Sequence, residues 1–99
     1  MIKVEVVKNR ISILGHANYA DYGKDIVCAA VSSVVTTTVE SIASFDNEAI
    51  ELIQNENKLE IIQKKHDHIT NNLIETMLNL LSKLEKKYPK NIKITNKEE

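Results

Sequence analysis

Apolar and charged residues alternate at the start of the chain. Every second residue from 2 to 6 is apolar in the run IKVEV, which is the period of a strand with one buried face. A polar turn at residues 8–10 separates this run from a second β-branched run at 11–14. We therefore predict two strands that pair as a hairpin.

The apolar spacing becomes helical after residue 25. Between residues 26 and 44, apolar or β-branched residues recur every three or four positions, which predicts a helix. The positions are Val27, Ala30, Val31, Val34, Val35, Thr38 and Ile42. The run VSSVVTTTV opposes this helix, because β-branched residues lose rotamer freedom there. A strand is the competing interpretation, and we expect the helix because the spacing fits a period of 3.6 better than a period of 2.

A second hairpin follows a break at residues 45–47. The runs 49–54 and 59–63 flank a polar turn, and alternation puts apolar residues on both of their faces. Ile50 and Leu52 share one face, while Ile53 and Ile62 lie on the reverse face. A half-apolar reverse face on so small a domain predicts self-association, and we expect a homodimer.

A second amphipathic helix has the clearest periodicity in the chain. Its apolar stripe, which we expect to face the core, is Ile69, Leu73, Met77, Leu80, Leu81, Leu84 and Tyr88. Pro89 ends this helix, and Ile92 and Ile94 predict a last short strand. The element order is therefore β-β-α-β-β-α-β. It predicts an α+β domain with a curved, mostly antiparallel sheet packed with two helices, as a single domain over residues 1–99.

Composition narrows the class of protein. The net charge of −1 gives no basic excess for direct nucleic-acid binding. Lysines cluster toward the C-terminus, but they alternate with acids and apolar residues as on a solvated face. One cysteine allows no internal disulfide and suits a reducing cytoplasm. The N-terminal residues alternate instead of forming an apolar block, so we expect neither a signal peptide nor a membrane association.

The stretch from Gly15 to Ser32 carries the candidate chemistry. His16 ends the second predicted strand, and Cys28 falls in the first turn of the first helix, where Asp25 is a good N-cap. Unpaired N–H groups and the helix dipole favour a thiolate at that position. A neutral imidazole within reach could take the thiol proton, which is the arrangement of Cys/His nucleophilic catalysis. A small buried cysteine and a surface histidine are the alternative interpretation.

Residues around this pair have two interpretations each. Gly15 either gives a substrate room beside the strand end or simply closes the strand. The loop with Tyr19, Tyr22 and a hinge-capable Gly23 either covers a substrate or packs down as a loop. Ser32, one turn after the cysteine, hydrogen-bonds site groups or its own backbone.

His66 and His68 raise a zinc hypothesis. Together with His16 and Cys28 they would supply four ligands. We reject this hypothesis because the close ligand spacing typical of structural zinc sites is missing from the sequence. We therefore expect no metal.

The sequences GHA and GKDIVCAAVS resemble the signature of the ribosomal-processing cysteine proteases, the Prp family. That signature has a glycine and histidine in GHA, an aspartate and cysteine in DxxC, and a serine one turn later. In this sequence they are Gly15, His16, Asp25, Cys28 and Ser32.

This resemblance implies a cytoplasmic cysteine endopeptidase that removes the N-terminal extension of large-subunit ribosomal protein L-twenty-seven. It implies Cys28 as nucleophile and His16 as its base, and a cleft under Tyr19, Tyr22 and Gly23 for an extension with apolar and aromatic residues. Neither a metal nor an organic cofactor is implied. Two other functions stay open: a non-catalytic ribosome-associated binding module, and a dimerisation module with an inert cysteine.

Overall fold

A computed structural model describes residues 1–15 and 26–97 of the chain. The predicted order of elements is confirmed. The chain forms β1 (Ile2–Val7), β2 (Arg10–Leu14), α1 (Ile26–Phe45), β3 (Ile50–Asn55), β4 (Lys58–Gln63), α2 (His68–Lys87) and β5 (Ile92–Asn96).

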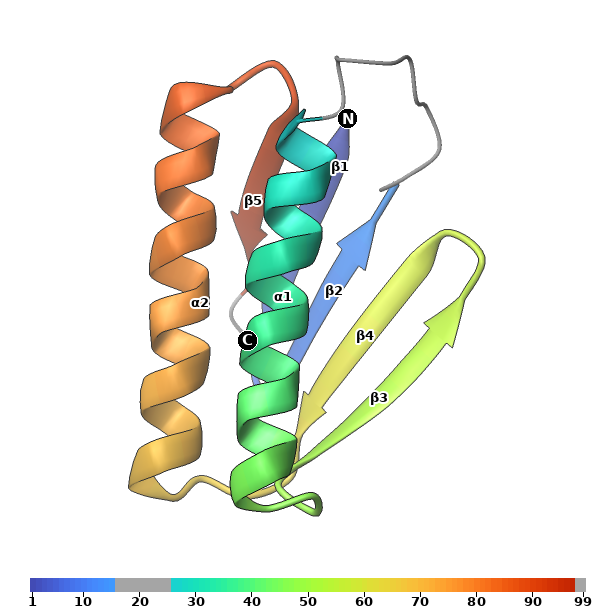
Figure 1. Ribbon diagram of the computed structural model, residues 1–99. Helices are drawn as coiled ribbons and strands as arrows, with labels where there is room; N and C mark the ends of the chain where they lie inside the picture. The colour runs from blue at the N-terminus through green and yellow to red at the C-terminus, as the bar shows by residue number, and fades with distance from the viewer. Residues whose placement is uncertain (16–25, 98–99) are drawn as a thin grey trace.

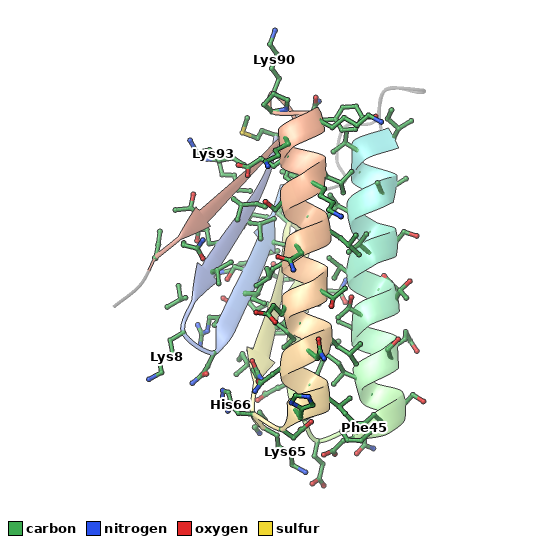
Figure 2. All side chains as sticks on the ribbon, turned by 90° about the vertical axis from the view of Figure 1, so that its left-hand side faces the viewer. Lys8, Phe45, Lys65, His66, Lys90 and Lys93 are labelled. Carbon is green, nitrogen blue, oxygen red and sulfur yellow. The ribbon has the colours of Figure 1, made fainter. Side chains whose placement is uncertain are left out.

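The strands form one mixed sheet in the order β3-β4-β2-β1-β5. Neighbouring strands are antiparallel except β1 and β5, which are parallel. Both helices lie on one face of this sheet, so the α+β fold has two layers (Figures 1 and 2). Figure 1 also shows the β3–β4 hairpin extending sideways beyond the two helices.

Helix α1 forms despite its β-branched composition. Val27, Val31, Val35 and Ile42 are buried along one side of it, as the spacing predicts. Burial of this side against the sheet and α2 therefore outweighs the weak intrinsic propensity of the sequence. By length and composition alone α1 could also cross a membrane. That observation is weak, because an apolar helix that packs in a core passes the same test.

Helix α2 begins at a side-chain cap. The carboxylate of Asp67 accepts hydrogen bonds from the Thr70 backbone N–H at 2.8 Å and from the Thr70 hydroxyl at 2.9 Å. Both bonds favour the ionised carboxylate and lower the pKa of Asp67. Because its hydroxyl is paired, Thr70 is fully buried at 0 % exposure.

The buried stripe of α2 differs from the prediction. Its centre is Thr70, Ile74, Met77 and Leu81. Ile69 and Leu80, which we predicted to face the core, are 44 % and 41 % exposed. The buried side of α2 includes Thr70, a polar residue whose hydroxyl is paired with Asp67. The side that faces the core is therefore rotated relative to the predicted apolar stripe.

The predicted faces of the second hairpin are confirmed by its register. Leu52 pairs with Ile61 on the helix side, and Ile53 pairs with Glu60 on the reverse side. Leu52 and Ile53 are 45 % and 42 % exposed, so both faces of β3 show apolar surface.

An ionic cluster surrounds Glu60 on the reverse face of the sheet. Lys58 lies 3.0 Å and Arg10 3.7 Å from the same carboxylate oxygen, and the Ser12 hydroxyl donates to it at 3.5 Å. The Lys58 contact is the main cause of the lowered pKa of Glu60. The cluster therefore joins β2 and β4 across the face that the helices leave uncovered.

Candidate active site

Cys28 is the third residue of α1, as the capping argument predicts. Its side chain is half-buried and packs against the hydrophobic core. The first N–H groups of a helix lack intrahelical partners and carry the positive end of the helix dipole. A thiol at this position is therefore in a setting that stabilises its thiolate.

Gly15 immediately follows the end of β2. Its φ of +78° is in the left-handed region, and its N–H donates to the Asn57 carbonyl at 3.0 Å. A Cβ here would lie 2.8 Å from the Met1 carbonyl oxygen. Only glycine fits both the conformation and the space, so the backbone just before His16 is tightly fixed between the N-terminus and the β3–β4 turn.

The strand end and the helix start belong to one region of the molecule. Figure 1 shows that β2 ends, and α1 begins, at the same end of the two layers. The sequence between these two elements contains His16, Tyr19, Tyr22, Gly23 and Asp25, which are outside the described residues. The pairing of His16 with Cys28 therefore stays a prediction.

Ser32 lies one helical turn beyond Cys28 and is exposed. It lines a cleft of about 120 Å³ between α1 and the strands. The other lining residues are Ile13, Val31, Val35, Thr36, Gln54 and Leu59.

Gln54 and Leu59 were missed as candidates for this cleft. The sequence predicts the second hairpin only as a structural element and a surface for self-association. One signal was available, because alternation puts Gln54 on the same face as Ile50 and Leu52; in the structure Gln54 pairs with Leu59. What the sequence did not show is that this side of the hairpin faces α1 one to two turns beyond Cys28.

The zinc hypothesis fails on geometry. His66 lies in the β4–α2 connection, at the same end of the molecule as Phe45, the last residue of α1 (Figure 2). Cys28 is 17 residues from that end of the helix, roughly 25 Å at 1.5 Å per residue. His66 instead contacts the Asn9 side-chain oxygen at 2.7 Å. His66 and Cys28 therefore cannot bind the same ion.

The fold matches a solved protease. It superimposes with a TM-score of 0.87 on a crystal structure of the essential ribosomal processing protease Prp from Staphylococcus aureus, at 26 % identity. The alignment covers 98 % of this chain and 100 % of that one, and that structure contains a covalently linked product peptide. The fold is therefore that of a small ribosomal processing protease.

Sequence comparison gives the family. The family model for cysteine protease Prp matches residues 1–93. The ribosomal processing cysteine protease Prp of S. aureus is 34 % identical over 92 residues, which cover 84 % of this chain and 81 % of the relative. The chain therefore belongs to the Prp family. The Mycoplasma genitalium protein of the same name is 40 % identical over 55 residues, which cover 56 % of this chain and 52 % of that relative. The chain therefore spans about half the length of the M. genitalium protein.

Proposed function

We propose that this protein is a cytoplasmic cysteine endopeptidase that removes the N-terminal extension of large-subunit ribosomal protein L-twenty-seven, acting as a single domain over residues 1–99. The observation that carries the proposal is Cys28 in the first turn of α1, in a chain of the Prp family. The names of the relatives support the substrate class, and the covalently linked peptide on the S. aureus protein supports a covalent step.

In the proposed reaction, Sγ of Cys28 attacks the carbonyl carbon of the scissile bond. His16 takes the thiol proton and returns it to the amine as the C–N bond breaks, which leaves the extension on sulfur as a thioester. Water then cleaves the C–S bond, releases the extension as a carboxylic acid and restores the thiol. Backbone N–H groups around Val27 and Cys28 stabilise the oxyanion of each tetrahedral intermediate.

The neighbouring residues have supporting roles in this proposal. Asp25 caps α1 or orients the imidazole of His16, and Ser32 hydrogen-bonds groups of the site. Gly15 keeps the approach to His16 open. Tyr19 and Tyr22 cover the apolar extension, with Gly23 as their hinge. No metal or organic cofactor takes part.

The direct test is mass analysis after mixing the protein with the N-terminally extended ribosomal protein. We expect cleavage by the wild type, and none by Cys28→Ala or His16→Ala, because each removes half of a pair that acts as a unit. Cys28→Ser should bind the extension but barely cleave it, since a hydroxyl is far harder to deprotonate. Cleavage by Cys28→Ala would overturn the mechanism. Tight binding without cleavage by the wild type would favour a non-catalytic ribosome-associated module.

Alkylation separates a reactive thiol from an inert one. If the helix terminus and His16 lower the pKa of Cys28 below the ordinary ~8.5, iodoacetamide modifies the folded protein readily near neutral pH. His16→Ala should react more slowly at the same pH. A Cys28 that reacts only after denaturation would favour the dimerisation module with an inert cysteine.

We also propose that the protein is a homodimer through the reverse face of β3 and β4. The exposed Ile53 at 42 % supports this surface. Light scattering should give twice the chain mass, and Ile53→Lys should yield monomers. Leu52→Lys is the matched control, because Leu52 is similarly exposed at 45 % but lies on the opposite face of the same strand, and it should stay dimeric. A wild type that remains monomeric at high concentration contradicts the proposal.

A further inference from the structure

Another cavity lies between α2 and the sheet, at the end of the molecule opposite the start of α1 (Figure 1). It has a volume of about 440 Å³, and both residues of the β1–β2 turn line it. Figure 2 shows Lys8 of this turn toward the end of the molecule that holds His66, away from Lys90. The cavity is therefore separate from the candidate catalytic region around Cys28.

The floor of the cavity is apolar because α2 leaves part of β1 uncovered. Alternation puts Val4 and Val6 on the same face of β1, yet Val4 is 0 % exposed and Val6 is only half-buried. Leu78 is likewise half-buried, although it lies one turn after the buried Ile74. The apolar lining residues include Val6, Ile11, Ile61, Ile74 and Leu78. A hydrocarbon group in the cavity would displace water from these side chains, which favours binding.

The rim of the cavity carries positive charge. Lys8 and Arg10 both line it, and none of its described lining residues is acidic. The Arg10 guanidinium also lies 3.7 Å from Glu60, so its charge is partly compensated. Lys8 makes no ion pair within residues 1–15 and 26–97. A negatively charged group at the rim would therefore gain a cationic partner in Lys8.

Hydrogen bonds hold the amide side of the rim in place. Nε2 of Gln63 donates to Oδ1 of Asn71 at 2.7 Å, which ties the end of β4 to α2. Nε2 of His66 lies 2.7 Å from Oδ1 of Asn9, which connects the β1–β2 turn to the β4–α2 connection. The walls of the cavity are therefore preformed, and a ligand that enters it need not order them.

We propose that this cavity binds a small amphipathic anion, a medium-chain carboxylate whose hydrocarbon chain lies on the floor and whose carboxylate lies at Lys8. Ligand sites typically have volumes of about 300–1,000 Å³, an apolar lining and a few polar groups. Since roughly 150 Å³ admits a benzene molecule, about 440 Å³ admits a chain of about eight carbons with its carboxylate. The proposal does not depend on the protease function, because the lining residues lie outside the stretch from Gly15 to Ser32.

The first experiment titrates the protein with octanoate and follows backbone amide shifts by NMR. We expect saturable shifts at Val6, Ile11 and Leu78, with a dissociation constant of about 1 mM or tighter. Hexanoate should bind about 10-fold more weakly, because it buries two fewer methylene groups. Octanoate that shifts none of these amides at about 10 mM, or that shifts only residues of another cleft, would overturn the proposal.

The second experiment tests the charge at the rim. Lys8→Glu should weaken octanoate binding about 5-fold, whereas 1-octanol, which has the same chain without the charge, should bind the variant and the wild type alike. Lys90→Glu is the matched control, because it makes the same change in net charge at the other end of the molecule (Figure 2). Equal weakening by the two variants would overturn the placement of the carboxylate at Lys8.

The third experiment fills the cavity. Leu78→Trp adds a large ring at the floor, so octanoate affinity should fall at least about 10-fold. Leu80→Trp is the matched control, because Leu80 is 41 % exposed and lines the outer groove between α1 and α2. It should bind octanoate like the wild type. Circular dichroism checks that each variant is folded, and Val6→Phe replaces Leu78→Trp if that variant is not. A folded, filled variant that binds octanoate as tightly as the wild type would refute the proposal.

Discussion

Gly15→Ala tests how closely the backbone before His16 controls the proposed site. The substitution adds one methyl group at a φ of +78°, next to the Met1 carbonyl oxygen at 2.8 Å. That oxygen belongs to the backbone and cannot rotate away. The end of β2 or the start of β1 must therefore shift, and the backbone leading to His16 shifts with it.

The loss of stability has two sources. A non-glycine residue in the left-handed region costs about 1–2 kcal/mol, and relief of the short contact adds to this. We expect a total loss of about 2–3 kcal/mol. For a domain of this size, about 1 kcal/mol corresponds to a change of 4–8 °C in Tm, so the Tm should fall by about 10–20 °C.

The assay measures Tm by circular dichroism and peptide cleavage at a temperature at which each variant is folded. Displacement of a catalytic group by about 1 Å can lower the rate about 100-fold, so we expect Gly15→Ala to lose most of its kcat while folded. Ile42→Ala is the control. Ile42 is 1 % exposed in the second half of α1, so its loss costs about 2–5 kcal/mol but leaves the site in place.

Gly15→Asn separates the two sources of the loss. Asparagine tolerates the left-handed region better than alanine, but its Cβ meets the same oxygen. If the short contact dominates, the two variants melt alike; if the conformation dominates, the asparagine variant is more stable. A Gly15→Ala protein that melts and cleaves like the wild type would refute this reasoning.

Two further predictions concern carboxylates whose pKa is lowered in the fold. The contacts of Glu60 with Lys58, Arg10 and Ser12 lower its pKa from 4.5, so its stabilisation is complete above that value and is lost as the pH falls through the folded pKa. Glu60→Gln should flatten this acid dependence in urea unfolding between about pH 6 and 3, and an unchanged profile would exclude the cluster as its source. Asp67→Asn should keep most of the Tm, because asparagine also caps helices, whereas Asp67→Ala should lower it; equal melting of these two variants would contradict the capping role.

The sequence predicts the elements well because their signals are local. Period-two and period-3.6 patterns identify each strand and helix of the described residues, including α1 against its own propensity. The pairing of β1 with β5 was not predicted, because nothing in either strand specifies a parallel neighbour about 90 residues away. The stripe of α2 was misplaced for another reason: Thr70 is polar by composition, and only its bonds to Asp67 show that it can be buried.

For the candidate site, too, local features could be predicted from the sequence, whereas contacts between distant elements could not. Cys28 in the first helical turn follows from neighbouring residues, so it could be predicted. The cleft could not, because Ile13, Val35 and Leu59 come from three elements that meet only in the folded sheet. Burial explains why α1 can form although it is rich in β-branched residues. Since the isolated helix would be unstable, its first turns are ordered by the burial of Val27 and Val31, and Val31 also forms the cleft floor. The burial that orders the helix therefore also fixes its first turn, which contains Cys28.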